Sequence, residues 1–430
     1  MTDASMTKHP GPRLAIGLLA ALALSACAGE LNPINRLNRA SAGAAPTAPT
    51  VPLDLPVITQ TQLADFDAAL RLIADRYVDP KALEGRTNAL REARAAVIRG
   101  MTDEAFAASL RQVLGGLNDP GIELITAADL QSDVAPGGLG IFIGPPERGA
   151  ERALALSVAP GSAAELAGLR AHDAITQIDG QPVGLASTSE LRRRLRGAIG
   201  SKVTVTVVSP GKAARDVSIT RGALASSPPA QARTLPGTNL AYLALAPADA
   251  GNAAEILAST LRGSGSQPAE GLILDLRSMQ SPAFNTYEVA ELFAHGGIGA
   301  VVERDGRQKI EITGKNVGGS QEIPLVILVG DQTRGPAESL AGLLQDLGRA
   351  RIIGARTPGR TEVLANVRLP SGTMAIAFPS GDVRGIRDSV WHARGPTPGI
   401  RPTVLIDKRF EDYTEDNDEM LAAAIRAFGR

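Results

Sequence analysis

The feature that most constrains this chain is a stretch in its C-terminal half, residues 323–360 of 430. Leu325–Val329 is an uninterrupted apolar run, which is typical of a strand buried on both faces. A turn bounded by two glycines follows at residues 330–335, and Pro336 then stands where a first helical residue often stands. Apolar residues next recur at helical spacing, namely Leu340, Leu343, Leu344 and Leu347. Backbone N–H groups converge where a strand, a tight turn and a helix N-terminus follow one another, so such a turn is a common place for a catalytic nucleophile.

This stretch resembles, in register, the core of the C-terminal processing, or tail-specific, serine peptidases. The matching residues are Glu338, Ala341, Gly342, Asp346, Arg349, Ala350, Gly354, Thr357 and Gly359. The resemblance places the nucleophilic serine of the family at Gly335, its general-base lysine at Arg360 and the glutamine that orients the lysine at Leu364. The frame of the family is therefore present, but none of its three catalytic side chains is.

The chemistry of these three positions decides what the match implies. A serine peptidase needs a hydroxyl that attacks the carbonyl and a nearby group that takes its proton. Gly335 has no side chain, and Arg360 is charged at any working pH, so it cannot act as a base. No lysine lies between Lys315 and Lys408, and His392 is the one histidine of that interval. We therefore expect no intact catalytic residue, and a displaced nucleophile and base are the alternative.

A second segment, residues 271–277, matches a Leu-Asp-Leu-Arg segment of the same family. In the family an Asn-x-x-Gly-Gly run follows and supplies a backbone N–H to the oxyanion hole, but here Ser281 and Pro282 replace the two glycines. Proline has no N–H, and loss of one such donor typically costs about two to three decades in rate. Asp275 and Arg277 are expected to form a buried structural ion pair.

Residues 136–221 resemble a PDZ domain. The residues that match its peptide-receiving loop and strand are Gly137, Gly138, Leu139, Gly140 and Ile141. Glycines there let backbone N–H groups point at a carboxylate, and the strand that follows offers an edge for a peptide strand. We therefore predict that a protein or peptide C-terminus binds there, with residues 188–195 as the groove helix. His172 stands where the family usually has glycine, and it is interpreted as a surface residue.

The N-terminus predicts secretion. Lys8 and Arg13 precede an apolar run at residues 14–26 that is too short for a stable membrane span and is typical of a signal peptide. The run ends in Leu-Ser-Ala-Cys, the pattern of a bacterial lipoprotein cleavage site, and Cys27 is the single cysteine. We expect lipidation of Cys27 to tether the mature chain to a membrane. The alternative is an ordinary secretory signal with an accidental thiol. Ala28 resembles outer-membrane sorting, so we expect a lipid-anchored protein of the bacterial cell envelope, at the outer membrane facing the periplasm.

The chain is expected to divide into five parts joined by short connections. They are a lipoprotein signal peptide at residues 1–27, a disordered tether at 28–57, an N-terminal helical segment at 58–130, an inserted PDZ domain at 135–222 and a peptidase-like core at 237–430, with a linker at 222–236. Alternating strands and helices predict an α/β (α+β) core, and the resemblance implies the tail-specific protease type of the ClpP/crotonase-like fold. A net charge of −1 and 3% aromatic residues give no reason to expect nucleic acid binding. The resemblance implies no cofactor and no metal.

Two kinds of function follow. The first is a pseudopeptidase, a tethered protein that holds protein or peptide C-termini through the PDZ groove without cleaving them. The alternative is an active serine-type endopeptidase of the same family with a displaced nucleophile and base. A narrower hypothesis treats Arg360 and the helix N-terminus at Pro336 as an anion site for a peptide carboxylate. The interpretation that we favour over this hypothesis is that Arg360 only pairs with Glu338 or Glu362.

Overall fold

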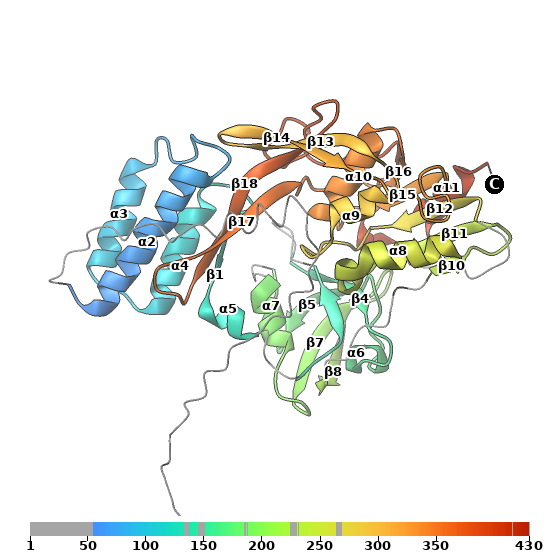
Figure 1. Ribbon diagram of the computed structural model, residues 1–430. Coiled ribbons are helices and arrows are strands. Elements are labelled where there is room, and N and C mark those ends of the chain that lie inside the picture. Colours follow the sequence, from blue (N-terminus) through green and yellow to red (C-terminus); the bar gives the residue numbers. More distant parts are fainter. Residues whose placement is uncertain are drawn as a thin grey trace, which may run out of the picture.

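The computed structural model describes residues 55–132, 137–144, 151–184, 186, 188–223, 230, 232–263, 269–414 and 416–429. Cys27, the predicted signal peptide and all but the last residues of the predicted tether lie outside these ranges. Across the described ranges, no helix is long and apolar enough to cross a bilayer. Figure 1 shows a group of N-terminal helices in blue, a β-rich body in green and a larger α/β body from yellow to red.

The N-terminal body, predicted as a helical segment, is a bundle of three helices. They are α2 (Val57–Arg76), α3 (Thr87–Ile98) and α4 (Asp103–Gly115), followed by β1 (Glu123–Ile125) and α5 (Ala127–Ser132). The hydroxyl of Thr102 caps α4 by accepting the amide hydrogen of Ala105 at 3.2 Å. Phe66 and Phe106 are fully buried and share one core with Phe378 from the C-terminal half. The helical segment is therefore packed onto the rest of the chain.

The green body is built on one antiparallel sheet with the strand order β3-β4-β5-β7-β8. The strands are β3 (Ile141–Ile143), β4 (Ala153–Val158), β5 (Ala174–Ile178), β7 (Lys202–Val208) and β8 (Arg215–Thr220), with β6 (Gln181–Pro182) on β5. Two helices accompany it, α6 (Ala163–Leu166) and α7 (Thr188–Leu195). The helix at 188–195 is predicted correctly, and β7 pairs with β8 as an antiparallel hairpin. Strand β3 lies at the edge of this sheet.

The α/β core has a six-stranded sheet in the order β10-β11-β12-β15-β16-β19. The strands are β10 (Ala232–Thr234), β11 (Leu240–Ala244), β12 (Gly271–Asp275), β15 (Leu325–Val329), β16 (Arg351–Gly354) and β19 (Val404–Leu405), parallel from β11 onward. Every residue of β12 and β15 is buried, because both faces of the sheet are covered. The helical elements are η1 (Pro247–Asn252), α8 (Ala253–Arg262), α9 (Thr286–Glu291), α10 (Pro336–Asp346), η2 (Phe410–Asp412) and α11 (Glu419–Arg426).

A second, antiparallel sheet joins the N-terminal helices to the core, as the long ribbons of Figure 1 show. Its order is β1-β18-β13-β14, with β17 also on β18. The new strands are β13 (Gly296–Glu303), β14 (Gly306–Ile312), β17 (Glu362–Arg368) and β18 (Ala375–Gly385). Strand β18 pairs with β1 at one end and with β13 at the other, so it spans the two bodies. Strands β13 and β14 pair antiparallel as a hairpin.

The segment predicted as a linker, residues 222–236, contains two short strands in place of an unpaired connection. Strand β9 (Gly222–Ala223) pairs with β2 (Gly137–Gly138), and β10 pairs with β11. Both strands form because distant partners supply their hydrogen bonds. Their Ala-, Ser- and Pro-rich composition gave no sign of this.

Candidate functional site

The turn between β15 and α10 is built as an elbow for a side chain that the sequence does not supply. Gly335 is the N-cap of α10 and has φ 64° and ψ −136°, a conformation that L-residues rarely adopt. A Cβ added to Gly335 would meet no other atom within 4 Å. Thr333 fixes the turn, since its hydroxyl donates to Leu276 O at 3.0 Å and accepts from Gly330 N at 2.9 Å. A strained, rigid backbone at the start of a helix is the geometry of a nucleophile position.

Glu338, one turn into α10, ties this helix to the segment that carries Arg360. Its carboxylate is fully buried and accepts hydrogen bonds from Thr357 Oγ1, from Gly359 N at 2.7 Å and from Arg360 N at 2.7 Å. Burial raises the pKa of Glu338 to about 7, although the three donors oppose this by favouring the charged form. Glu338, which matches the family frame, therefore has a structural role: it holds the segment 357–360 against α10.

Arg360 forms an ion pair with Glu362, the first residue of β17. Its Nε donates to Glu362 Oε1 at 2.7 Å, and the side chains are 22% and 4% exposed. This confirms the favoured interpretation of an ion pair with Glu362, while Glu338 receives the backbone amide of Arg360 in place of its side chain. Leu364 lies on the same strand, next to an irregularity in the β17–β18 register, and is 37% exposed. The structure thus links the helix that begins after Gly335 to the backbone of Arg360 through Glu338, and it places Leu364 within β17, which follows Arg360.

The turn predicted for the oxyanion hole lies against the elbow. Met279 O accepts from Arg334 N at 3.0 Å, and Gln280 Nε2 donates to Gln332 Oε1 at 3.2 Å. Ser281 is buried, and the residue that follows it is Pro282, which offers no backbone N–H.

The predicted ion pair of Asp275 and Arg277 is confirmed beside this turn. Arg277 bonds Asp275 Oδ2 at 2.5 Å and Asp418 Oδ2 at 2.7 Å, with all three side chains 6–8% exposed. Burial alone would raise the pKa of Asp275, but the Arg277 guanidinium holds that pKa below its ordinary value. This charged triad is part of the fold beneath the site.

His392, the one histidine between Lys315 and Lys408, belongs to a structural network. Its Nε2 lies 3.2 Å from Asp382 Oδ2, and Asp382 also pairs with Arg394. Arg394 in turn bonds Asp119 Oδ2 at 2.5 Å, and Tyr77 donates its hydroxyl to the same carboxylate at 2.5 Å. This chain of contacts binds the N-terminal helices to the core. Among the described residues, no serine hydroxyl forms a hydrogen bond with the side chain of a histidine or a lysine; Ser320 Oγ donates to the backbone carbonyl of Lys315 alone.

The predicted peptide loop presents three backbone donors in a row. Within the described part of the chain, the amides of Leu139 and Gly140 donate to no hydrogen bond. Gly140 O accepts from Ala159 N at 2.8 Å, so the alternation of an antiparallel ladder turns the N–H of Ile141 to the open edge of β3. Gly140 needs its glycine, because it has φ +76° and a Cβ would lie 2.3 Å from Ser162 Cβ. Gly137 and Gly138 have another role, since they pair with β9 and Gly137 N donates to Gly197 O at 3.0 Å.

The far end of β3 meets the elbow. A Cβ on Gly144 would lie 3.0 Å from Gln332 Oε1 and 3.2 Å from Gln280 Nε2, so this residue touches both turns of the core. Strand β3 therefore runs from the loop at Leu139 and Gly140 to the elbow turn.

His172 is not the surface residue that the sequence interpretation proposed. It has φ 75°, and its Nδ1 lies 2.6 Å from the carbonyl oxygen of Phe410 in the core. Its ring stacks on that of Phe410, with centroids 4.1 Å apart. The one sequence signal of a special role for His172 was a histidine where the family usually has glycine. The sequence could not identify its partner, Phe410, which lies 238 residues away.

These features define a class of protein: a peptidase-type α/β core with an elbow at the carboxyl end of a central strand, served by a peptide-binding domain. Comparisons with known proteins agree. The family model "Peptidase family S41" matches residues 239–401, and the model "PDZ domain" matches residues 155–209.

Two curated relatives are carboxyl-terminal-processing proteases of cyanobacteria. The protein of Synechocystis sp. is 31% identical over 281 residues, which cover 62% of this chain and 62% of that protein. The protein of Picosynechococcus sp. is 33% identical, covering 63% of this chain and 66% of that protein. The matches thus span slightly less than two thirds of each relative.

Among solved structures, the photosystem II D1 C-terminal processing protease is similar with a TM-score of 0.61 and 25% identity, over 81% of this chain and 93% of that chain. Mature CPAF shares the fold alone, with a TM-score of 0.53 and 14% identity over 87% and 98%. The chain belongs to the C-terminal processing peptidase family, S41, and carries its PDZ domain.

Proposed function

We propose that this chain is a membrane-tethered pseudopeptidase that binds protein or peptide C-termini without cleaving them. The observation that carries the proposal is Gly335, an elbow with nucleophile geometry and open space where a side chain would stand. Acyl transfer by this family needs a hydroxyl at that point and a base beside it. Arg360 supplies a permanent cation that is paired with Glu362, so neither component of the reaction is available there.

Tail binding is supported by the loop at the start of β3. The N–H groups of Leu139, Gly140 and Ile141 can receive a terminal carboxylate, and the open edge of β3 can pair with the residues before it. A peptide bound antiparallel to β3 would have its carboxylate at Gly140 and its upstream residues near Gly144. At about 3.4 Å per residue, the four steps from Gly140 to Gly144 span roughly 14 Å. The peptide would therefore pass the elbow about four or five residues from its end.

Calorimetry with two peptides of one sequence tests the carboxylate. We expect the peptide with a free C-terminal carboxylate to bind and its C-terminal amide to bind at least tenfold more weakly, because a hydrogen bond to a charged group contributes about 1.5–3 kcal/mol. Gly140→Ala should abolish binding of the free acid. Gly211→Ala is the matched control, since Gly211 has φ +71° in the same domain but no atom within 4 Å of an added Cβ. Equal binding of acid and amide would contradict the proposal.

Mass spectrometry of the same mixtures tests catalysis. We expect the peptide to remain intact after long incubation with the purified chain. Cleavage that a serine-directed inhibitor blocks would establish the alternative, an active endopeptidase with a displaced nucleophile.

The tether and the location are part of the proposal and rest on the sequence of residues 8–28. The apolar run and Cys27 support lipidation, and a lipid chain on Cys27 would hold the protein at the outer membrane, facing the periplasm. A protein anchored in this way would hold its partners, proteins with accessible C-termini, at the membrane surface.

A further inference from the structure

The contact between the PDZ domain and the core is centred on His172. Its ring stacks on Phe410 at 28°, and the ring of Tyr413 lies 4.7 Å from it. The Nδ1 atom must carry the hydrogen, because its partner at 2.6 Å is the Phe410 carbonyl, which can only accept. A second proton would therefore be added at Nε2 and would make the ring a cation.

The surroundings of the ring oppose that cation. The charged groups that face it from the core are Arg277, Asp275 and Asp418. Both carboxylates already bond Arg277, so they are committed to another cation, and Arg277 itself lies 4.6 Å above the Tyr413 ring. Burial lowers the pKa of His172, and Arg277 lowers it further, while the Phe410 carbonyl and the two carboxylates act in the opposite direction.

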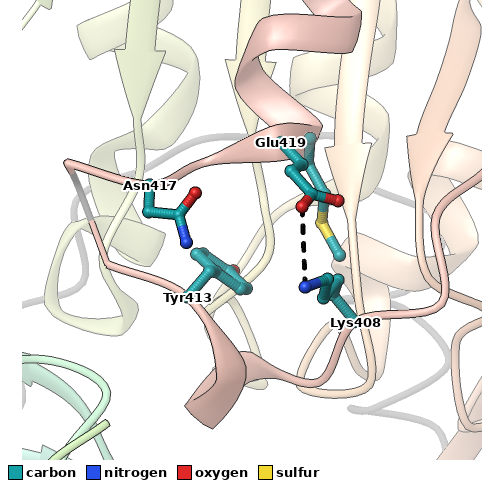
Figure 2. Close-up of a pocket in the computed structure, with 5 residues that line it drawn as sticks. Lys408, Tyr413, Asn417 and Glu419 are labelled. Carbon is teal, nitrogen blue, oxygen red and sulfur yellow. Dashed lines mark ion pairs between the residues drawn. The ribbon is translucent and has the colours of Figure 1, made fainter. Parts of the chain in front are cut away.

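Further contacts surround this ring. Leu154, Leu156 and Ala174 of the PDZ domain belong to the same buried cluster as Phe410 and Tyr413. Arg152 of the PDZ domain pairs with Glu411 in η2. Figure 2 shows Tyr413 beside Lys408 and Glu419, which form an ion pair at 3.6 Å. The hollow between these side chains is too small for a water molecule.

The same contact reaches the elbow. Phe410 N donates to Asp331 Oδ1 at 3.1 Å, and Asp331 is in the turn that leads to Gly335. Gln332, the next residue, is the one that touches Gly144 at the end of β3. The PDZ domain therefore contacts two adjacent residues of the turn. It reaches Asp331 indirectly, because His172 contacts Phe410 of η2, and it reaches Gln332 directly through Gly144 after β3.

We propose that His172 is a pH-sensitive latch: the neutral ring docks the PDZ domain on η2, and protonation of the ring loosens the domain and frees the elbow turn. The undocked ring binds a proton more readily than the docked ring, so acidification favours undocking. Each tenfold difference in proton affinity between the two states becomes a tenfold change in the docking equilibrium at a pH below both pKa values. The latch concerns docking alone and does not require that the chain bind or cleave tails.

Hydrogen exchange of the full chain at pH 7.5 and pH 5.5, corrected for intrinsic rates, measures docking. We expect amides of β4, η2 and residues 330–335 to exchange several-fold faster at pH 5.5 than at pH 7.5, because protonation of His172 favours the undocked state. His172→Asn should remove this difference, because asparagine tolerates a left-handed backbone and donates a hydrogen bond but does not titrate. His295→Asn, at an exposed histidine, is the matched control and should behave as wild type.

A second measurement does not depend on how the variant folds. Histidine-selective NMR of the wild-type chain should show that His172 titrates below the ordinary value of 6.5, and that its resonance and the Phe410 amide change together. An unshifted titration of His172 would overturn the latch. The same pH response in wild type and His172→Asn would also overturn it, since His392 is buried as well and would then account for the effect.

Discussion

Restoring the three family side chains at Gly335, Arg360 and Leu364 should not restore a peptidase. A serine fits at Gly335, because no atom lies within 4 Å of its Cβ, and the cost is backbone strain of about 1–2 kcal/mol at φ 64°. A lysine at 360 would face Glu362, which is 4% exposed, and this carboxylate would keep the amine protonated. Pro282 still offers no N–H to the oxyanion, a defect of about 10²–10³-fold.

The assay compares the triple variant Gly335→Ser, Arg360→Lys, Leu364→Gln with one that also carries Ser281→Gly and Pro282→Gly. Hydrolysis of a tail peptide by the triple variant should not exceed that of a control with alanine at 335. The rate of hydrolysis by the variant with all five substitutions should exceed that of the triple variant by roughly 10²–10³-fold, since it regains one oxyanion donor. Hydrolysis by the triple variant above that of the alanine control would refute the reasoning, and equal activity of the two serine variants would show that the charged lysine at 360 beside Glu362 limits both. Urea unfolding of each variant shows whether a loss of stability accounts for the result.

Three further predictions test the frame, the joint between bodies and the tether. Between pH 4.5 and about 7, Glu338 keeps its proton in the folded state but loses it in the unfolded state. The free energy of unfolding should therefore fall over that pH range by on the order of 3 kcal/mol. Glu338→Gln should remove this slope in urea titrations, and a slope that persists would contradict the assignment. Arg394→Met leaves Asp119 and Asp382 buried without their cation and should lower the free energy of unfolding by about 3–5 kcal/mol, measured by denaturant titration. Cys27→Ser should abolish labelling by a radioactive fatty acid and move the chain from the membrane fraction to the soluble fraction, and unchanged labelling would exclude lipidation at this residue.

The parts of the fold that follow from local sequence were predictable. The apolar run of β15 and the proline and leucine spacing of α10 are properties of neighbouring residues, so the strand, the elbow and the helix could be placed from the sequence. The same holds for α2, α3 and α4. The ion pair of Arg277 with Asp275 spans two residues and was predicted, but its second partner, Asp418, is 141 residues away and was not.

The contacts that join the bodies could not be predicted, because nothing near them in the sequence indicates a partner. His172 meets Phe410 across 238 residues, and Arg394 meets Asp119 across 275. Strands β9 and β10 have weak intrinsic preference for extended structure and exist through pairing with β2 and β11. In each case the partners are distant in sequence and adjacent only in the folded chain, so only the tertiary structure reveals the contact.

Burial explains why the family frame and the proposed loss of chemistry can coexist in one chain. Glu338 and Gly354 match the frame and are buried, and the fold needs both residues. The carboxylate of Glu338 accepts hydrogen bonds from two backbone amides. A Cβ on Gly354 would lie 2.0 Å from Val329 O. The three assigned catalytic positions differ, because Gly335 borders open space and Arg360 and Leu364 are 22% and 37% exposed. Substitution at an exposed position such as Leu364 usually changes stability by less than about 0.5 kcal/mol, and glycine at 335 relieves the strain that a side chain would have at φ 64°. A chain of this family can therefore change its nucleophile, base and orienting residue while the elbow, the helix and the PDZ domain remain in place.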